Sequence, residues 1–115
     1  MIAEDSDLSR DLLVQIFEDA YEIELATDGG TAVVIASTTR LDAILMDISL
    51  PGLSGLDAVR SIRAGGSTVP IVAVSSHVMP GDRELALEAG CDDFVGKPFD
   101  DEVLVATVRR LVGAS

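Results

Sequence analysis

The stretch Leu41-Asp42-Ala43-Ile44-Leu45-Met46-Asp47 decides the fold, because it is a short and mostly apolar run that closes on a carboxylate. Three other apolar runs are also followed directly by polar residues, which are Glu4-Asp5, Ser75-Ser76 and Lys97. Short apolar runs bounded by turn signals are typical of buried strands. If these strands are parallel, their polar ends meet at one edge of a sheet, where open α/β sheets bind ligands.

Strand and helix patterns alternate along the whole chain, which predicts a parallel sheet with helices on both faces. The expected strands cover residues 1–3, 21–26, 41–47, 70–74 and 93–96. The expected helices run from 6 or 7 to about 19, from 31 to about 38, from 56 to the Gly65-Gly66 stop, from 82 to 89, and onward from a cap at Asp100. This order predicts the α/β flavodoxin-like class, a doubly wound (βα)5 fold with strand order 2-1-3-4-5.

Size and composition limit the possible functions. The 115 residues fit one domain covering 1–115, and 48 % hydrophobic residues are enough for a real core. A net charge of −12 argues against direct binding of nucleic acid or anionic membranes, both of which need clustered bases. We expect a cytoplasmic protein without membrane insertion, because the chain has one cysteine, no apolar run near the ~20 residues of a membrane span and no secretion signal.

The polar ends of the predicted strands supply the groups that phosphoryl chemistry needs. Close carboxylates repel each other, and a divalent cation relieves that repulsion. Oxygen ligands without nearby cysteine or histidine favour Mg²⁺ over zinc. An aspartate can also act as a nucleophile and carry a phosphoryl group, whose oxygens Lys97 and the Ser75 hydroxyl can bind. Each residue alone has an ordinary explanation as a turn former, a cap or a solvated charge, but their shared placement favours one site.

Taken together, these motifs resemble a response-regulator receiver domain, the phosphoacceptor half of two-component signalling. The resemblance extends over nearly the whole chain, in order and at family spacing. The matching stretches are Ile2-Ala3-Glu4-Asp5, residues 44–56 with Pro51 and Gly55, residues 70–77, Gly81-Asp82, residues 89–94 and Lys97-Pro98-Phe99.

The resemblance implies a metal and phosphoryl site. Asp47 corresponds to the phosphoacceptor, Asp5 to the direct metal ligand and Glu4 to a ligand that acts through water, with the Ser49 carbonyl as a further metal ligand. Mg²⁺ is the implied cofactor, for which Mn²⁺ or another divalent cation can substitute.

The remaining motif residues correspond to switch, tuning and structural positions of the family. Ser75 is the switch hydroxyl, Phe94 the switch aromatic, and Lys97 the phosphate-binding lysine before an often cis bond to Pro98. Ser49 and His77 fall at positions that tune the lifetime of the phosphoryl group, while Pro51 and Gly55 are structural.

The implied function is that of a switch rather than of a multiple-turnover enzyme. The chain would take a phosphoryl group from a phosphohistidine of a histidine kinase or a histidine phosphotransfer protein, and lose it again by slow hydrolysis. It would signal to a downstream target or output domain through the face formed by its last two helices and last strand. The short first strand and the end at Ser115 leave open a stand-alone receiver, a fragment of a regulator or a piece of a hybrid kinase.

Three rival interpretations remain open at the level of sequence. A haloacid-dehalogenase-type phosphatase also uses an aspartyl-phosphate, but it needs a second aspartate two residues after its nucleophile, where this chain has Ser49. A flavodoxin-like cofactor binder needs Ser, Thr and Gly amides in its first loop, where this chain has Glu4-Asp5-Ser6-Asp7. A pseudo-receiver would keep the fold without the chemistry, and the glutamate at position 4, where aspartate is commonest, leaves that possibility open.

Overall fold

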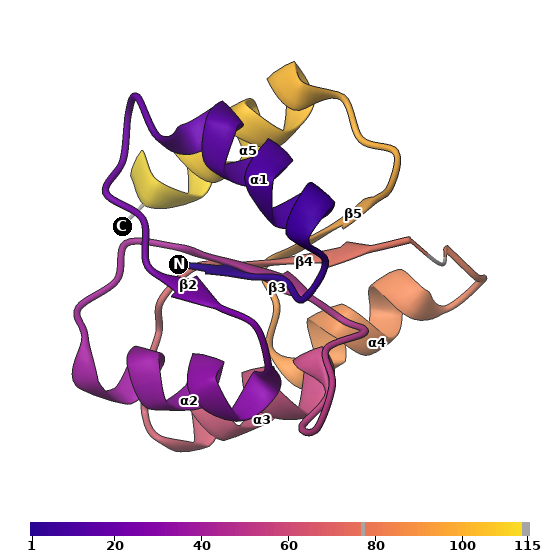
Figure 1. Ribbon diagram of the computed structural model, residues 1–115. Helices are drawn as coiled ribbons and strands as arrows, with labels where there is room; N and C mark the ends of the chain where they lie inside the picture. The colour runs from indigo at the N-terminus through magenta and orange to yellow at the C-terminus, as the bar shows by residue number, and fades with distance from the viewer. Residues whose placement is uncertain (77, 114–115) are drawn as a thin grey trace.

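The computed structural model describes residues 1–76 and 78–113, in which five strands and five helices alternate. The strands are β1 (Ile2–Ala3), β2 (Leu25–Ala26), β3 (Ile44–Asp47), β4 (Ile71–Ser75) and β5 (Asp93–Gly96). The helices are α1 (Asp7–Phe17), α2 (Gly29–Thr38), α3 (Gly55–Ala64), α4 (Asp82–Ala89) and α5 (Asp101–Gly113). Helices α1 and α5 cover one face of the sheet, and α2, α3 and α4 cover the other (Figure 1).

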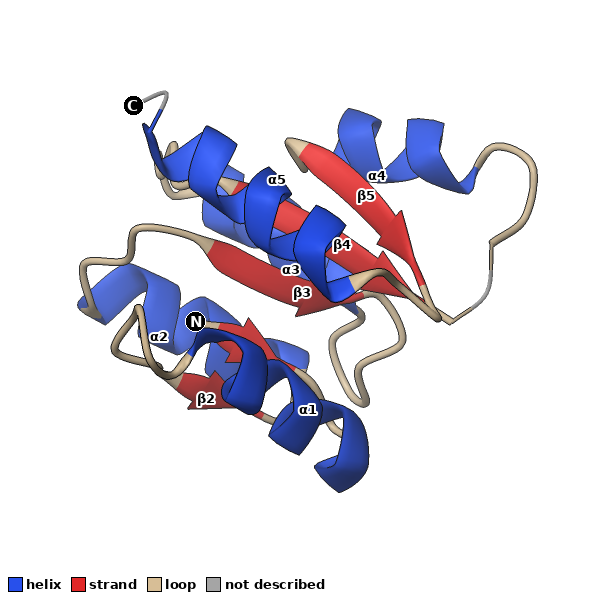
Figure 2. Ribbon diagram, turned by 90° about the horizontal axis from the view of Figure 1, so that it is seen from above, coloured by secondary structure: helices blue, strands red, loops and turns tan. Residues whose placement is uncertain are grey.

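All five strands are parallel and lie in the order β2-β1-β3-β4-β5, which confirms the predicted topology (Figure 2). The register pairs Ala3 of β1 with Met46 of β3, and Asp47 with Val74 of β4. At the far side of the sheet, Ser75 pairs with Gly96. Because neighbouring strands end at nearly the same level, the residues at and just after their carboxyl ends lie side by side.

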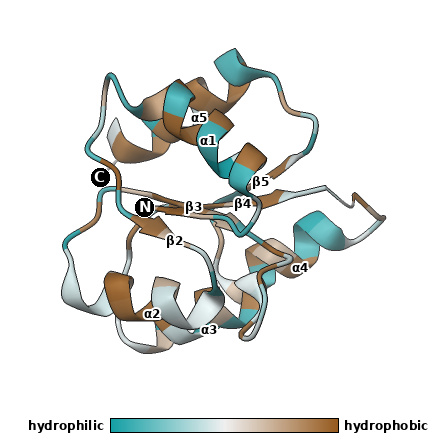
Figure 3. Cartoon of the chain, viewed as in Figure 1, coloured by the Kyte–Doolittle hydropathy of each residue, from teal (hydrophilic) through white to brown (hydrophobic). Residues whose placement is uncertain are grey.

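Apolar side chains form one core on each face of the sheet. The strands and parts of the helices that flank them carry the hydrophobic colour in Figure 3. Strand β3 is buried on both faces, since Ile44 and Met46 pack against the α2–α3–α4 layer and Leu45 packs against the α1–α5 layer. A strand covered on both sides reads as a continuous apolar run. This explains why the stretch ending at Asp47 is so informative in the sequence. None of the helices in the described ranges is long and apolar enough to cross a bilayer.

Side-chain caps set the start of several helices. The hydroxyl of Ser6 accepts a hydrogen bond from the Ser9 N–H, and the carboxylate of Asp28 accepts one from the Thr31 N–H. Asp100 caps α5 as predicted, by accepting from the N–H groups of Glu102 and Val103 at 2.8 and 3.2 Å. These bonds satisfy backbone donors that a helix leaves without a partner in its first turn.

Four predicted bounds differ from the structure by two residues or more. The strand predicted over 41–47 begins only at Ile44. The strand predicted over 21–26 contains only Leu25–Ala26, because β1 offers β2 only two residues to pair with. Helix α1 ends at Phe17 rather than near Asp19. Helix α2 begins at Gly29, two residues before its predicted start, because Asp28 already serves as its cap.

Candidate functional site

The carboxyl edge of the sheet, where the strands end, brings together the three acids singled out in the sequence. Glu4 and Asp5 follow β1, and Asp47 closes the neighbouring strand β3. Each of the three can offer a carboxylate oxygen that lies within 4.8 Å of those from the other two. Glu4 and Asp47 are buried, whereas Asp5 is exposed at the mouth of the site. The prediction that these acids converge is therefore confirmed.

Glu4 is the most deeply buried acid of the site, with 1 % of its surface exposed. Its Oε1 lies 2.5 Å from Lys97 Nζ, and its Oε2 accepts a hydrogen bond of 3.3 Å from the Ser6 N–H. Burial raises the pKa of Glu4 above its ordinary value of 4.5, and the adjacent Asp47 raises it further, while Lys97 acts in the opposite direction. The lysine thus stabilises a carboxylate that its surroundings otherwise disfavour.

The backbone of the loop after β3 holds the carboxylate of Asp47 in place. Its Oδ1 accepts a hydrogen bond of 3.0 Å from the Ser49 N–H, which fixes the plane of the carboxylate. The loop after Asp47 folds back so closely that a Cβ added at Gly55 would lie 2.1 Å from the Asp47 carbonyl oxygen. Gly55 is therefore required by the space available.

Ser75 and Lys97 belong to the same edge. Ser75 ends β4 and is buried, and its carbonyl oxygen accepts a hydrogen bond of 2.7 Å from the Lys97 N–H. Lys97 follows β5 at the border of the sheet, and its side chain extends back over the edge to Glu4. Among the described residues, Lys97 has no ion pair with Asp47 and forms its ion pair with Glu4 instead.

Charge and donor chemistry at this edge suit a hard divalent cation. With all three acids ionised, one ammonium leaves two negative charges in excess. Carboxylate oxygens near a solvent-exposed mouth are the ligands that Mg²⁺ accepts, since it retains several waters. The residues present therefore fit a magnesium ion, and no described cysteine or histidine adds the softer ligands that zinc prefers.

The other residues singled out in the sequence lie at or near this edge or in the elements beside it. The Lys97–Pro98 peptide bond is cis, as the resemblance implies. Phe94 lies in β5 and packs half-buried against the core of the α2–α3–α4 side. Pro51 lies exposed in the loop after β3. His77 lies outside the described residues.

Two contacts were not predicted from the sequence. The bond between Glu4 and Lys97 joins residues that were assigned to separate tasks. Arg10 on α1 donates from Nη1 to the carbonyl oxygen of Glu4 at 3.3 Å, and it also forms a close ion pair with Asp7. The Asp7–Arg10 spacing of three residues on a helix indicates the second contact, but no local pattern indicates the first.

The opposite, amino edge of the sheet also collects acids, but there they are matched by arginines. Asp92 pairs with Arg63, and Asp93 pairs with both Arg83 and Arg110. Burial acts to raise the pKa of Asp93, but the Phe94 N–H and the guanidiniums of Arg83 and Arg110 together outweigh it and lower the pKa. These contacts tie β5 to α3, α4 and α5.

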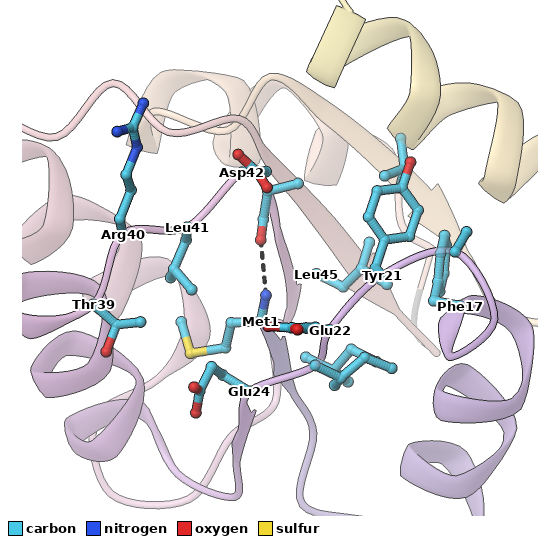
Figure 4. A pocket seen from close by; sticks show the side chains of 15 residues that line it. Met1, Phe17, Tyr21, Glu22, Glu24, Thr39, Arg40, Leu41, Asp42 and Leu45 are labelled. Carbon is cyan, nitrogen blue, oxygen red and sulfur yellow. Dashed lines mark hydrogen bonds between the residues drawn. The ribbon is translucent and has the colours of Figure 1, made fainter.

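A cavity of about 530 Å³ opens at the same amino edge, beside the starts of β1, β2 and β3 (Figure 4). Its walls combine apolar groups such as Phe17 and Leu45 with exposed acids such as Asp42, and the amino group of Met1 donates to the Ala43 carbonyl oxygen at 2.8 Å. No three acids of this cavity approach one another as the acids of the carboxyl edge do. Within the described residues, the candidate chemistry therefore lies at the carboxyl edge alone.

Sequence comparison identifies relatives along most of the chain. The family model described as "Response regulator receiver domain" matches residues 1–109. The transcriptional regulatory protein PrrA of Mycobacterium leprae is 38 % identical over 112 residues, which cover 97 % of this chain and 48 % of that protein. This chain therefore spans about half the length of such curated relatives.

Solved structures give the same result. The receiver domain of the sensor histidine kinase PA1611 from Pseudomonas aeruginosa, which has a magnesium ion coordinated in its active-site cleft, matches with a TM-score of 0.89 and 38 % identity, covering 97 % of this chain and 94 % of that one. The receiver domain of Ssk1 from Saccharomyces cerevisiae, crystallised with the histidine phosphotransfer protein Ypd1, matches with a TM-score of 0.89 and 30 % identity over 97 % and 86 % of the two chains.

Proposed function

The chain belongs to the response regulator receiver domain family, and from this premise we propose that Asp47 accepts a phosphoryl group from a protein phosphohistidine. The observation that carries the proposal is the convergence of Glu4, Asp5 and Asp47 within 4.8 Å, next to one lysine. An acid cluster that keeps an excess of negative charge is suited to hold a divalent cation, and that cation is what an anionic phosphoryl group needs in order to approach.

Asp47 is the nucleophile in this proposal. The Ser49 N–H holds Oδ1, so Oδ2 is the oxygen that we assign to the attack. An O–P bond forms at Oδ2 while the P–N bond to the donor histidine breaks, and the histidine leaves with the electron pair of that bond. Phosphoryl transfer of this type has a loose transition state with charge on its equatorial oxygens, so positioned positive groups provide most of the catalysis.

Asp5, Asp47 and the Ser49 carbonyl are the groups that we assign to Mg²⁺, with Glu4 at the rear of the cluster. When bound, the cation neutralises charge on a phosphoryl oxygen. Lys97 supplies a second positive group from the β5 side, and the Ser75 hydroxyl lies on the strand between Asp47 and Lys97. A phosphoryl group at Asp47 would attract Ser75 and the loop that follows it, which couples the chemistry to α4.

The signal would leave through the face formed by α4, β5 and α5. Phe94 lies in the middle of that face and is half-buried. Asp93 ties β5 to Arg83 of α4 and to Arg110 of α5, so a movement of β5 is transmitted to both helices. A downstream protein or an attached output domain is the proposed recipient, in keeping with the transcriptional regulators among the relatives.

A protein donor is favoured by the surface beside the site. A groove of about 220 Å³ lies between α1 and the loop after β5, and it is lined by Leu12, Ile16, Phe99 and the Lys97–Pro98 pair. Leu8 and Leu12 of α1 are 73 % and 50 % exposed. The relative Ssk1 has been crystallised with a histidine phosphotransfer protein, and a donor of that class would present its phosphohistidine over this rim.

The experiment that tests the proposal is labelling with acetyl phosphate and Mg²⁺. We expect hydroxylamine-sensitive phosphate on the wild type and none on Asp47→Asn. Asp42→Asn is the matched control, since it removes an exposed acid at the amino edge of the same strand region and is expected to leave labelling unchanged. Equal labelling of Asp47→Asn and the wild type would contradict the assignment.

A phosphatase role is the alternative, and it is separated by measuring the turnover of a phosphate ester. A haloacid-dehalogenase-type phosphatase uses a second aspartate two residues after its nucleophile, and Ser49 lacks the carboxyl group for that role. We therefore expect slow loss of the phosphoryl group and no repeated turnover of a phosphate ester. Many turnovers per chain would favour the enzyme instead.

A further inference from the structure

Lys97 forms an ion pair with Glu4, which distinguishes Glu4 from the other two acids at the carboxyl edge. Lys97 Nζ lies 2.5 Å from Glu4 Oε1, and the two side chains are 19 % and 2 % exposed. Among the described residues, this is the ion pair of Lys97, and Asp47 is not within ion-pair distance of it. The lysine is therefore directed to Glu4 rather than to the nucleophile.

The length of the glutamate makes this contact possible. Strands β1 and β5 are separated by β3 and β4, a lateral distance of ~14 Å at the usual strand spacing. Lys97 and Glu4 must bridge it from opposite sides, and an aspartate at position 4 would be shorter by about 1.5 Å. Glu4 is also fixed at its other end, because Oε2 accepts from the Ser6 N–H and its carbonyl oxygen accepts from Arg10.

The same carboxylate belongs to the metal cluster, since Glu4 offers an oxygen within 4.8 Å of those of Asp5 and Asp47. A divalent cation in the cluster and the ammonium of Lys97 would then lie against one carboxylate. Two cations at such a distance repel each other strongly in a partly buried site. Each cation therefore weakens the hold of Glu4 on the other.

We propose that Glu4 is a positioning residue that holds Lys97 in the metal-free protein, and that the cation and Lys97 compete for Glu4. Uptake of the cation weakens the Glu4–Lys97 bond and frees the ammonium to turn toward Asp47. This inference rests on the proposed function, because it gives an order to the site: the metal binds first, and Lys97 then becomes available to the phosphoryl group.

The sequence offers a direct test, because Lys97 is the only lysine in the chain. In protein labelled with ¹³C,¹⁵N-lysine, the side-chain Cε and Nζ signals report on this residue alone. We expect Glu4→Gln to shift both signals toward those of a solvated lysine, and saturating Mg²⁺ to shift the wild-type signals in the same direction. Glu22→Gln, an exposed glutamate at the amino edge, is the control that is expected to leave the signals in place.

A second comparison separates competition for Glu4 from the mere proximity of a cation. Proximity alone would make Mg²⁺ move the Lys97 signals equally in the wild type and in Glu4→Gln, and that result would overturn the proposal. So would a wild-type titration that shifts the amides of Asp5 and Asp47 but leaves Lys97 unchanged. If Glu4→Gln does not fold, Glu4→Asp keeps the charge and shortens the side chain, and it is expected to give the same displaced lysine signal.

Calorimetry with Mg²⁺ gives an independent measurement. Lys97→Met removes the competing charge, so we expect it to increase Mg²⁺ affinity by about threefold or more in the wild type, and by clearly less in Glu4→Gln. An equal increase in both backgrounds would overturn the competition. Neither measurement involves phosphorylation: a lysine that moves in a protein that never labels at Asp47 would overturn the proposed function and leave this inference intact.

Discussion

The two edges of the sheet hold acids in similar numbers but treat their charge in opposite ways. At the amino edge, Asp92 and Asp93 are matched by Arg63, Arg83 and Arg110. At the carboxyl edge, three acids share one lysine. The first arrangement is complete by itself and ties helices to β5. The second leaves charge uncompensated, which costs stability in the resting protein and prepares the site for a cation.

The comparison predicts that changes at the two edges affect different quantities. Changes at the amino edge should lower the free energy of unfolding and leave Mg²⁺ binding alone. Changes of charge at the carboxyl edge should weaken Mg²⁺ binding and leave the free energy of unfolding nearly unchanged or slightly higher. A steric change beneath Asp47 is expected to affect both, because the backbone there is packed without spare space.

The largest effect is expected for Gly55→Ala. The new Cβ would lie 2.1 Å from the Asp47 carbonyl oxygen and 2.7 Å from Ile48 Cα, and backbone cannot move aside as a side chain can. We expect a loss of at least about 3 kcal/mol in urea denaturation, together with loss of Mg²⁺ binding. Gly30→Ala is the control: its Cβ meets only Asp28 Oδ1 at 3.5 Å, so a gain of about 0.5–1 kcal/mol is expected inside α2. A stable Gly55→Ala protein would contradict the close approach.

Asp92→Ala should give the next largest change. Asp92 Oδ2 accepts from the Ile71 N–H at 2.8 Å and from Arg63 Nη2 at 3.0 Å, so its loss leaves a backbone donor and one nitrogen of the guanidinium without this acceptor. We expect the free energy of unfolding to fall by about 2 kcal/mol, with no change in Mg²⁺ affinity. Asp19→Ala, which removes an exposed acid from the turn after α1, controls for net charge. A loss of Mg²⁺ affinity in Asp92→Ala that is absent from Asp19→Ala would contradict the claim that the two edges act separately.

Asp5→Asn should show the opposite pattern. Removing one carboxylate from the cluster lowers Mg²⁺ affinity by at least about tenfold, because a close charge is lost. The same change relieves repulsion in the metal-free protein, and since Asp5 is exposed, the gain in stability stays below about 1 kcal/mol. Calorimetry and urea denaturation without metal measure the two effects. Unchanged Mg²⁺ affinity would remove Asp5 from the site.

Asp93→Asn is expected to have the smallest effect and a pH dependence. Its lowered pKa means that the ionised form is stabilised by folding, so the contribution is present above the ordinary value of 3.8 and is lost as pH falls through the lowered pKa. We expect a cost of up to about 1 kcal/mol at neutral pH, because exposed arginines are its partners. The wild-type and variant curves of stability against pH should merge in acid. A constant difference down to pH 2 would contradict this account.

Sequence patterns predicted the carboxyl edge better than the amino edge, for a physical reason. The positions of Glu4, Asp5 and Asp47 follow from strand order and register, which depend on apolar runs that the sequence displays directly. The arginine pairs depend on how helices pack around β5, and no local pattern specifies that. Tertiary context also shortened the strand predicted over 21–26, because its neighbour β1 contributes only two paired residues.

The partner of Lys97 illustrates the same limit within the site. Its position after β5 was predictable from the motif, but its choice of Glu4 over Asp47 depends on side-chain length across three strand spacings. Cys91, which follows the end of α4, is 6 % exposed, and burial raises the pKa of its thiol to about 11.

The most direct test of the central claim is mass spectrometry of the chain after acetyl phosphate treatment, with Mg²⁺ and with a chelator, followed by mapping of the modified peptide. The account predicts one phosphoryl group per chain, on Asp47, formed with Mg²⁺ and absent with the chelator. A phosphoryl group on another residue, or equal modification without a divalent cation, would contradict it.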